Sequence, residues 1–568
     1  MMSQEFALTR RTQWIGIGLL SVMLVIVSWG FYSTRNSKIS SEGVEARDLQ
    51  SRLTELDLLG YPEMSTLAEA IRSNNVRERI SYEKLLPPLL QLLIHRSGLV
   101  RGRAARALGE YGKEKAIPYL VMALQFELIF SGGEDHIAAL QAITGHDFGG
   151  EWRRWYEEWW ADPKSHPPEG FEEWLIALYT SFIPSFKDFL QRDVARTVGL
   201  HEVMWGQVIK DEIEALDHPP MVSPTEAGVV LLEDEMVFGV YVNGEARAYP
   251  LRYLDVHELV NDTVGGRPIM ISFCTLCGSA LLYDREVEGV IYSFGNSGLL
   301  YRGNKLMFDR TTNTLWSNVW GKAVIGPLSA KELKLKRYPL DQLTWGEWKE
   351  LHPATKVLTI QAARIGPGRL RIPGGDPYQP GSAYREYRTD SDAIYPVAQR
   401  DQRLPPKAWV FGLIIQGQAK AYPMSVLAQN PAINDALAGV AIVLLTERTS
   451  LRMDLWNQGQ GVRAYERATH IFRVDDSGVL LDEERQSWER GEEALVNLIT
   501  GEKLDRIAGL KAYWFAWYEF YPETHLYQTN SDGELPQPCV SASPAWGAPA
   551  PSRSEAGRLS AMRILVDN

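Results

Sequence analysis

The chain has 568 residues, so we expect several domains, because single hydrophobic cores rarely grow beyond about 250 to 300 residues. Its formal net charge of -12 disfavours a nucleic-acid partner, since no dominant basic field is available to meet phosphates. We find no Walker loop, His-Glu-x-x-His motif, serine-hydrolase elbow or dinucleotide-binding glycine pattern. The common nucleotide, hydrolase and hydride chemistries therefore have no support.

An uncharged, mostly apolar run extends from Trp14 to Tyr32, with aromatic residues at both ends. This is about the ~20 residues needed to cross a bilayer, and interfacial aromatics are typical anchors. A cleaved signal peptide is the alternative, but the run is long for one and no small-x-small cleavage site follows it. We expect a single-pass transmembrane signal anchor at 14–32, with residues 1–13 in the cytoplasm. The membrane is thus an expected partner, and the bulk of the chain is expected to be extracytoplasmic.

After a linker at 33–61, residues 62–194 are predicted to be helical. A strongly apolar helix at Leu85–Ile94 is followed by Ser97–Gly109, whose apolar residues recur on one helical face. Pro118 opens the next helix. The pattern resembles HEAT-type repeats, in which each helix pair buries its apolar face by stacking on its neighbours. Such an array often binds a protein partner, and a spacer role is the alternative.

Two aromatic helices are predicted to follow. The first, Glu151–Trp160, places Trp152, Trp155 and Trp159 on one face. The second, Phe171–Gln191, has a similar pattern, and its polar face lacks the Lys and Arg excess typical of helices on membrane surfaces. We therefore expect both apolar faces to pack in the core.

An internal repeat organises the β-rich part of the chain. Val237–Pro250 aligns with Val410–Pro423 at a constant offset of 173, and the match continues to Gly266 and Gly439. Each copy begins with a predicted hairpin and ends with a short aromatic helix. The whole chain is therefore predicted to be α+β. The predicted boundaries are 195–360 for the first copy, 361–405 for a linker, 406–528 for the second copy and 529–568 for a disordered tail.

Two of only three cysteines, Cys274 and Cys277, are separated by two residues and follow a predicted buried strand. A thioredoxin-type pair would open a helix, whereas two short apolar segments typical of a hairpin follow here. A metal site, a disulfide, a redox-active pair of another type and reduced cysteines whose thiols merely pack remain as alternatives. At the offset of 173 the second copy has Glu447 and Ser450 at these positions, so the first copy is the candidate active half.

His257 and Glu258 are also replaced in the second copy, by Asn430 and Pro431. Two thiolates and an imidazole form a ligand set suited to zinc or copper. Glu258 or Asp309 is a candidate to complete this set or to orient the imidazole. The predicted catalytic residues are Cys274, Cys277, His257 and Asp309, and the predicted metal ligands are Cys274, Cys277, His257 and Glu258.

An ordered series of motifs between residues 195 and 528 resembles the DUF3179 family of bacterial and archaeal proteins. The motifs are Ala248–Leu251, His257–Asp262, Cys274–Ser279, Ser293–Tyr301, Met307–Arg310 and Leu315–Ser317. The sequence departs from the family pattern at Thr275, where proline is usual, and at Phe308, where tyrosine is common. The family has no established function, so the resemblance implies a domain but no activity.

Two hypotheses of different kinds follow. In the first, the chain is a membrane-anchored extracytoplasmic protein with a metal-binding or thiol-redox role at Cys274, Cys277 and His257. In the second, the chain is a non-enzymatic binding module whose cysteine pair forms a structural disulfide. A bridge across so short a loop removes little entropy from the unfolded chain, which weighs against a purely structural role.

Overall fold

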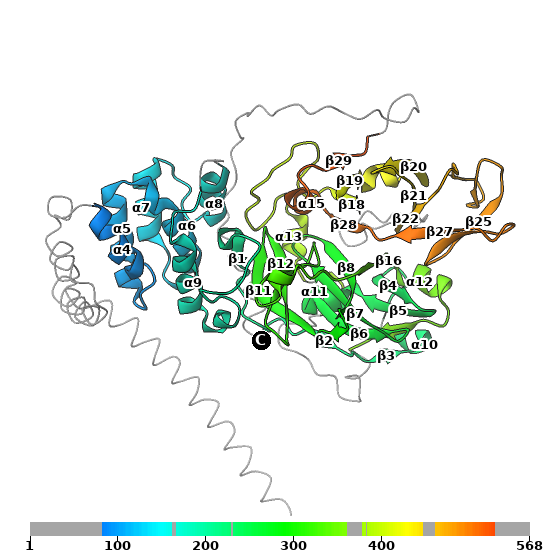
Figure 1. Ribbon diagram of the computed structural model, residues 1–568, viewed down its shortest axis with the longest axis horizontal. Helices are drawn as coiled ribbons and strands as arrows, with labels where there is room; N and C mark the ends of the chain where they lie inside the picture. The colour runs from blue at the N-terminus through cyan, green and yellow to red at the C-terminus, as the bar shows by residue number, and fades with distance from the viewer. Residues whose placement is uncertain are drawn as a thin grey trace, which may run out of the picture. The chain divides into compact units, whose positions relative to one another are not determined.

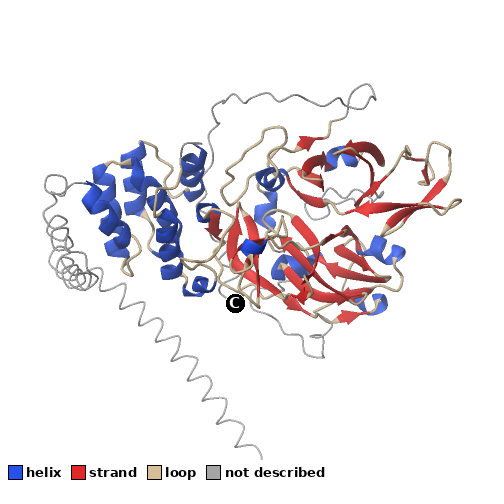
Figure 2. Cartoon of the chain, viewed as in Figure 1, coloured by secondary structure: helices blue, strands red, loops and turns tan. Residues whose placement is uncertain are grey.

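The computed structural model describes residues 82–161, 166–228, 231–360, 378–381, 383–446 and 461–528. The chain divides into two compact units between Gly150 and Glu151. Figure 2 shows helices in the first unit and mainly strands in the second. The α+β content and its order along the chain are as predicted.

The first unit is a stack of α-helices. They are α4 (Tyr82–Leu92), α5 (Gly98–Tyr111), α6 (Ile117–Phe130) and α7 (Glu134–Thr144). α6 is buried along most of its length, as expected for a helix that packs against neighbours on more than one face. The buried ion pair of Arg101 with Glu127 joins α5 to α6. Gly109 lets α5 approach α7 closely, since a Cβ there would lie 2.7 Å from the backbone of Ala139.

The predicted fold class is wrong in one element, the transmembrane helix. No helix in the described ranges is long and apolar enough to cross a membrane. The longest of these helices, α5 and α6, have 14 residues each, whereas a bilayer requires about 20. The run from Trp14 to Tyr32 lies outside the described residues.

The aromatic helices α8 (Trp152–Ala161) and α9 (Phe171–Phe182) open the second unit. Trp152, Trp155 and Trp159 are buried, which confirms the predicted core face. The second helix is shorter than predicted, because Pro184 stops it and a 3-10 turn follows at Pro184–Asp188.

Sheets of the first copy follow (Figure 1). One has the order β16-β4-β5-β17-β3, formed by Asp341–Thr344, Met236–Val242, Glu245–Pro250, Lys356–Leu358 and Met221–Val222. Another has the order β15-β8-β7-β6-β2, formed by Arg337–Tyr338, Ser279–Asp284, Arg267–Cys274, Leu259–Val264 and Leu216–Asp217. A third has the order β1-β11-β12-β13-β14, formed by Val203–Trp205, Phe294–Tyr301, Asn304–Asp309, Leu315–Ser317 and Ala323–Ile325. Helices α10 (Pro224–Ala227), α11 (Leu251–His257) and α12 (Trp345–Leu351) and the hairpin of β9 (Glu286–Val287) and β10 (Val290–Ile291) complete the copy.

The second copy repeats the first of these sheets in the same order. β28-β18-β19-β29 is formed by Leu510–Tyr513, Trp409–Ile415, Gln418–Pro423 and His525–Leu526. In both copies the first three strands are antiparallel and the fourth, β17 or β29, is parallel to its neighbour. The first copy has an additional antiparallel strand, β3, next to β17. A larger sheet has the order β20-β21-β22-β27-β26-β25-β24-β23, formed by Ala432–Leu437, Val440–Thr446, Val462–Glu466, Lys503–Ile507, Ala494–Asn497, Ser487–Arg490, Leu480–Leu481 and Arg473–Val474. The helices are α14 (Met424–Leu427) and α15 (Trp514–Phe520), and α13 (Arg385–Thr389) lies between the copies.

The copies also share individual polar contacts. Asn261 exchanges hydrogen bonds of 2.8 and 3.0 Å with the backbone of Phe294. Asn434 exchanges bonds of 2.7 and 2.8 Å with Phe472 in the same way. This equivalence supports the duplication that the sequence predicts.

Aromatic packing is duplicated as well. Trp348 covers Gly239 in the first copy, and Trp517 covers Gly412 in the second. A Cβ at these glycines would lie 2.4 and 2.1 Å from the indole rings. Each tryptophan therefore requires a glycine beneath it, which explains why both residue types recur at matching positions.

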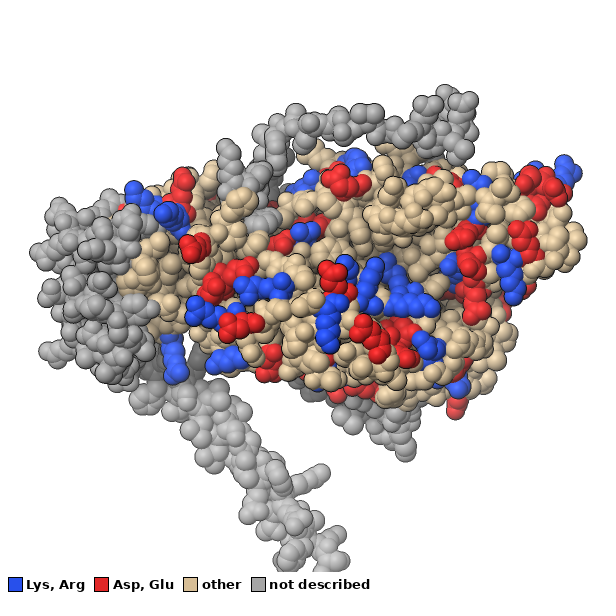
Figure 3. Space-filling view, viewed as in Figure 1, with Lys and Arg blue, Asp and Glu red and all other residues tan. Residues whose placement is uncertain are grey.

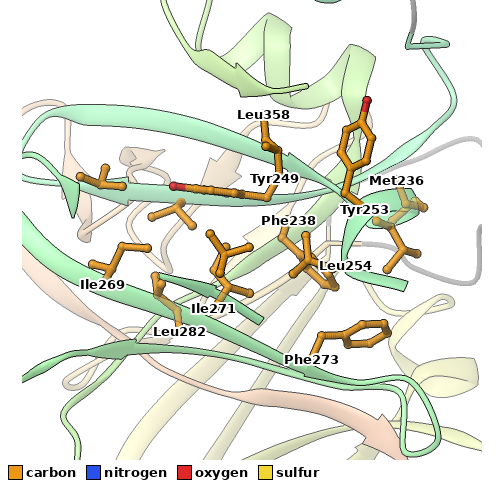
Figure 4. Close-up of a cluster of buried hydrophobic side chains, with 14 of the residues drawn as sticks. Met236, Phe238, Tyr249, Tyr253, Leu254, Ile269, Ile271, Phe273, Leu282 and Leu358 are labelled. Carbon is orange, nitrogen blue, oxygen red and sulfur yellow. The ribbon is translucent and has the colours of Figure 1, made fainter. Parts of the chain in front are cut away.

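A hydrophobic cluster supports the strands that lead to the cysteines (Figure 4). It includes fully buried side chains from α11, β4, β5, β7 and β8: Phe238, Tyr249, Leu254, Ile271 and Leu282. At about 25 cal/mol per Å² of apolar surface removed from water, such a cluster fixes the ends of β7 and β8 firmly. The turn between these strands is thus held on a rigid base.

A buried ion network joins the copies. Asp341 of the first copy contacts Arg463 at 3.1 Å and Arg506 at 2.7 Å, and Glu492 contacts the same two guanidinium groups at 2.6 and 2.7 Å. Burial alone would raise the pKa of Asp341, but the two arginines outweigh it and hold this pKa well below its usual range. The network therefore stabilises the charged carboxylate between the copies.

We expect Asp341→Asn to reduce the free energy of unfolding by about 3 to 5 kcal/mol, because it leaves two buried guanidinium groups undercompensated. A lowered pKa in the folded state means that the stabilisation is present above the unfolded pKa, near 3.9, and is lost as pH falls through the folded pKa. Urea unfolding should therefore show that the difference in free energy of unfolding between wild type and variant becomes smaller in acid.

The matched control is Glu233→Gln, which removes an exposed partner of Lys349. Its effect should stay below about 1 kcal/mol and vary little in acid. If the two substitutions lowered the free energy of unfolding equally, the role assigned to Asp341 would be contradicted.

Candidate functional site

Cys274 and Cys277 lie in the turn that joins β7 to β8. Cys274 pairs with Ser279 across the strands, and the Cys277 amide donates a 3.2 Å hydrogen bond to the Cys274 carbonyl. Gly278 has a φ of +62°, and a Cβ there would lie 2.3 Å from the Trp409 ring. The turn therefore requires glycine for two reasons, its backbone conformation and its close contact with Trp409. The predicted hairpin after the cysteines is confirmed as β9 and β10, so the pair does not open a helix.

Both cysteines are free thiols in the interior. The exposed fraction is 2% for Cys274 and zero for Cys277. The two side chains share a hydrogen bond. The Gly303 carbonyl, 3.3 Å from the Cys277 sulfur, is an alternative acceptor for the single Cys277 thiol proton. The pair is thus enclosed, and the two side chains are joined by a hydrogen bond.

The tip of the β11–β12 hairpin lies against the thiols. The Lys305 amide donates to the Cys274 sulfur, and the Asn304 side chain bonds to Cys277. Asn304 is held in turn by Ser279 at 3.0 Å and Asn318 at 2.9 Å. This hairpin therefore supplies polar contacts to both sulfurs.

Lys305 lies buried beside the pair, where burial lowers the pKa of its ammonium group and the charges of Glu258 and Cys274 oppose that shift. Its Nζ donates to the carbonyls of Glu258 at 3.0 Å and Phe273 at 3.5 Å, and lies 3.6 Å from the Glu258 carboxylate. Glu258 also accepts a 3.0 Å hydrogen bond from the Thr275 hydroxyl. Glu258 ends α11 with a φ of +58°, which is uncommon for a residue other than glycine. The left-handed backbone turns the chain from α11 into β6, next to the cysteines.

The two thiols have opposite acidities. Burial raises the pKa of Cys274, but the Cys277 hydrogen bond, the Lys305 amide and the Lys305 ammonium together bring that pKa below its ordinary value. Burial, the hydrogen bond to Cys274 and the charge of Cys274 raise the pKa of Cys277 well above its ordinary value. A single negative charge shared by the pair is therefore carried by Cys274.

Tyrosines of the segment between the copies cover the site. The Tyr387 hydroxyl donates to the Leu276 carbonyl at 2.6 Å, and Tyr384 bonds to Thr275. Tyr395 is 5% exposed, and the charges of Glu258 and Cys274 reach its hydroxyl. The cover is thus built from the predicted linker.

Residues of the second copy form one side of the cysteine site. The Tyr513 amide of β28 donates a 2.9 Å hydrogen bond to the Cys277 carbonyl. Trp409 of β18 lies over Gly278. The half that lacks cysteines therefore helps to shape the turn that carries them.

His257 faces other partners. Its Nδ1 lies 2.7 Å from the Glu214 carbonyl, and its Nε2 lies 2.8 Å from the Tyr378 hydroxyl. The imidazole also stacks on the Tyr378 ring. Both ring nitrogens thus have neighbours other than the two sulfurs.

Asp309 stabilises a turn. Its carboxylate accepts hydrogen bonds from the Thr312 amide at 2.7 Å and the Trp316 indole at 3.0 Å. In the second copy Asp482 accepts from the Trp488 indole at 2.9 Å. The offset from Asp309 to Asp482 is again 173, so the sequence already marked Asp309 as a shared residue.

The predicted metal ligands are only partly gathered. Cys274, Cys277 and Glu258 lie around Lys305, whereas His257 bonds elsewhere. In the described part of the chain no group of three or more His, Cys, Asp and Glu is positioned to hold a metal ion. Two sulfurs alone fall short of the three or four ligands typical of zinc sites, so we derive no chemistry through a metal.

Sequence reasoning missed Lys305, Asn304 and the covering tyrosines. A signal for the first two existed in the hairpin lengths. The offset between copies is 178 at Phe294 and 173 at Asp309, so the first hairpin is five residues longer. The extra length carries the tip that reaches the cysteines.

We expect Asp309→Ala to lower the free energy of unfolding by about 1 to 3 kcal/mol, since it removes several buried hydrogen bonds. Asp482→Ala should have a similar effect, because it breaks the equivalent indole contact. Neither should change the ultraviolet absorbance of the Cys274 thiolate in folded protein. A changed thiolate signal in Asp309→Ala alone would instead give Asp309 a role at the cysteines.

Two family models match parts of the chain. HEAT repeats match residues 60–127, consistent with the helical stack, and HEAT repeats commonly mediate protein interactions. The family described as "Protein of unknown function (DUF3179)" matches residues 210–524, more than half of the chain and the whole cysteine site. No curated protein and no solved structure matches the chain. The protein therefore belongs to the DUF3179 family and carries HEAT repeats before its family domain.

Proposed function

We propose that this DUF3179 protein acts by thiol redox chemistry, with Cys274 and Cys277 alternating between paired thiols and a disulfide. The observation that carries the proposal is the hydrogen-bonded pair of free thiols enclosed with Lys305 and Glu258. A nucleophilic thiolate needs a nearby positive charge, and a second thiol next to it can resolve an oxidised intermediate.

The two cysteines have different roles in this scheme. The Cys274 thiolate attacks the oxidant, and a bond forms between its sulfur and the oxidant while a leaving group departs. The Cys277 thiol then attacks the Cys274 sulfur, its proton goes to the second leaving group, and the disulfide forms. The dithiol loses two electrons, and the oxidant gains both.

The same geometry weighs against the other interpretations. A metal at the two sulfurs would need further ligands, but His257 bonds to Glu214 and Tyr378, and Glu258 bonds to Lys305 and Thr275. Burying the ammonium of Lys305 costs free energy. A purely structural disulfide carries no charge, so it would not compensate this cost. The redox role accounts for the thiols and the ammonium together.

We expect Lys305→Met to raise the pKa of the Cys274 thiol, because the thiolate loses its neighbouring positive charge. The measurement is the thiolate ultraviolet absorbance as a function of pH, taken as the difference from Cys274→Ser. Cys539 is the third cysteine of the sequence, so Cys539→Ser should serve as the background for all variants and leave only the paired cysteines to titrate.

Lys305→Arg keeps the charge and should retain more of the acidity than Lys305→Met. Lys356→Met, which changes a lysine that is more than half exposed on β17, is the matched control and should leave the titration unchanged. An unaltered titration in Lys305→Met that is folded by circular dichroism would refute the role of the ammonium.

A redox titration tests the function itself. Equilibrated with dithiothreitol buffers of graded potential, the Cys539→Ser protein should lose both thiols in one two-electron transition. Mass spectrometry should find the Cys274–Cys277 disulfide, and the transition should vanish in Cys277→Ser. If no disulfide forms at any potential, the proposal fails. Stoichiometric zinc or copper that survives chelation would favour the metal site in its place.

A further inference from the structure

The Tyr395 hydroxyl is a buried donor that finds no hydrogen-bond partner among the described residues. Tyr395 is 5% exposed, so water does not readily satisfy it. An unsatisfied buried polar group costs about 1 to 3 kcal/mol and requires an explanation. The Tyr395 side chain lies beside the cysteine pair, because a Cβ at Gly303 would be 3.9 Å from the Tyr395 Cβ and the Gly303 carbonyl is 3.3 Å from the Cys277 sulfur. The charges of Tyr384, Glu258 and Cys274 also act on this hydroxyl.

The site is also closed to large molecules. Cys274 is 2% exposed and Cys277 is fully buried. The segment between the copies is fastened over them, with the Tyr387 hydroxyl bonded to the Leu276 carbonyl at 2.6 Å. On the other side the Tyr513 amide is bonded to the Cys277 carbonyl at 2.9 Å.

This enclosure discriminates between classes of oxidant. Thiol–disulfide exchange requires the attacking sulfur to reach a disulfide sulfur directly, so its rate depends on access. A peptide or protein disulfide would have to displace the tyrosine cover before it could meet Cys274. An oxidant with two oxygen atoms needs far less displacement.

We propose that the oxidant of the Cys274–Cys277 pair is a small hydroperoxide, and that the Tyr395 hydroxyl donates a hydrogen bond to it. This inference rests on the proposed redox function and names its substrate class. The unpartnered hydroxyl, the closed cover and the adjacent second thiol carry it together.

The reaction balances as follows. The Cys274 thiolate attacks one peroxide oxygen, the O–O bond breaks, and a sulfenic acid forms on Cys274. The departing hydroxide accepts a hydrogen bond from the Tyr395 hydroxyl, takes up one proton from solvent and leaves as water. The Cys277 thiol then attacks the Cys274 sulfur, a disulfide forms, and a second water leaves. The dithiol supplies two electrons, which reduce one hydrogen peroxide to two waters.

The test compares two oxidants on the reduced full-length chain in the Cys539→Ser background. Hydrogen peroxide and glutathione disulfide, at equal concentration, are mixed with protein, and the remaining thiols are counted after acid quenching. Peroxide should oxidise the pair at least about tenfold faster. Tyr395→Phe should slow the peroxide reaction by about tenfold, since it loses one donor to the leaving oxygen, and should leave the glutathione reaction unchanged.

Tyr518→Phe, on α15 in the second copy, is the matched control and should react like wild type. In Cys277→Ser, dimedone should trap a sulfenic acid on Cys274, because the resolving thiol is gone. Faster oxidation by glutathione disulfide would overturn this inference and leave the proposed dithiol function intact. An unchanged peroxide rate in Tyr395→Phe would remove Tyr395 from the inference. Failure of both oxidants to form the disulfide would overturn the proposed function as well.

Discussion

The buried ammonium of Lys305 is the constraint on which the site depends. A charge taken out of water must find partners, and here these are the Glu258 carboxylate and the carbonyls of Glu258 and Phe273. The partners come from the end of α11 and the end of β7, whereas Lys305 comes from β12. Once these groups meet, the β11–β12 hairpin must lie across the cysteine turn, and its backbone and Asn304 fall on the two sulfurs.

Comparison of the two copies distinguishes residues that support the fold from residues that form the site. The Asn261 and Asn434 contacts and the paired Gly–Trp packing occur in both copies, because any copy of this fold needs them. The longer hairpin and the cysteine pair occur in the first copy only. The second copy still supplies Tyr513 and Trp409 to the turn, so it works as a wall of the site. On the face shown in Figure 3 basic and acidic side chains are interspersed, which agrees with a role that does not depend on a large field of one sign.

The sequence predicted those features that local pattern determines. Alternating apolar and polar residues around turn residues predicted the hairpins of both copies. Asn243 and Gly244 have the positive φ values that the first of these turns requires. The break after β7 excluded a thioredoxin-type helix. The site was harder to predict, because Lys305 and Tyr395 reach Cys274 only through tertiary structure. His257 is absent from the second copy, as the cysteines are, yet its partners are Glu214 and Tyr378, so a shared loss between copies does not identify a shared role.

The position of the cover gives the duplication a chemical consequence. Tyr384, Tyr387 and Tyr395 belong to the segment that connects the copies, and the ion network of Asp341 with Arg463 fixes how the copies meet. A single copy would lack both the wall and the cover, and its thiols would stand open to any disulfide or metal. In the proposed function, enclosure by the linker tyrosines and the second copy leaves the Cys274 thiolate within reach of small reactants only. In the proposed function, the copy without cysteines therefore contributes by keeping large reactants from the thiols, a role that needs no catalytic residue in that copy.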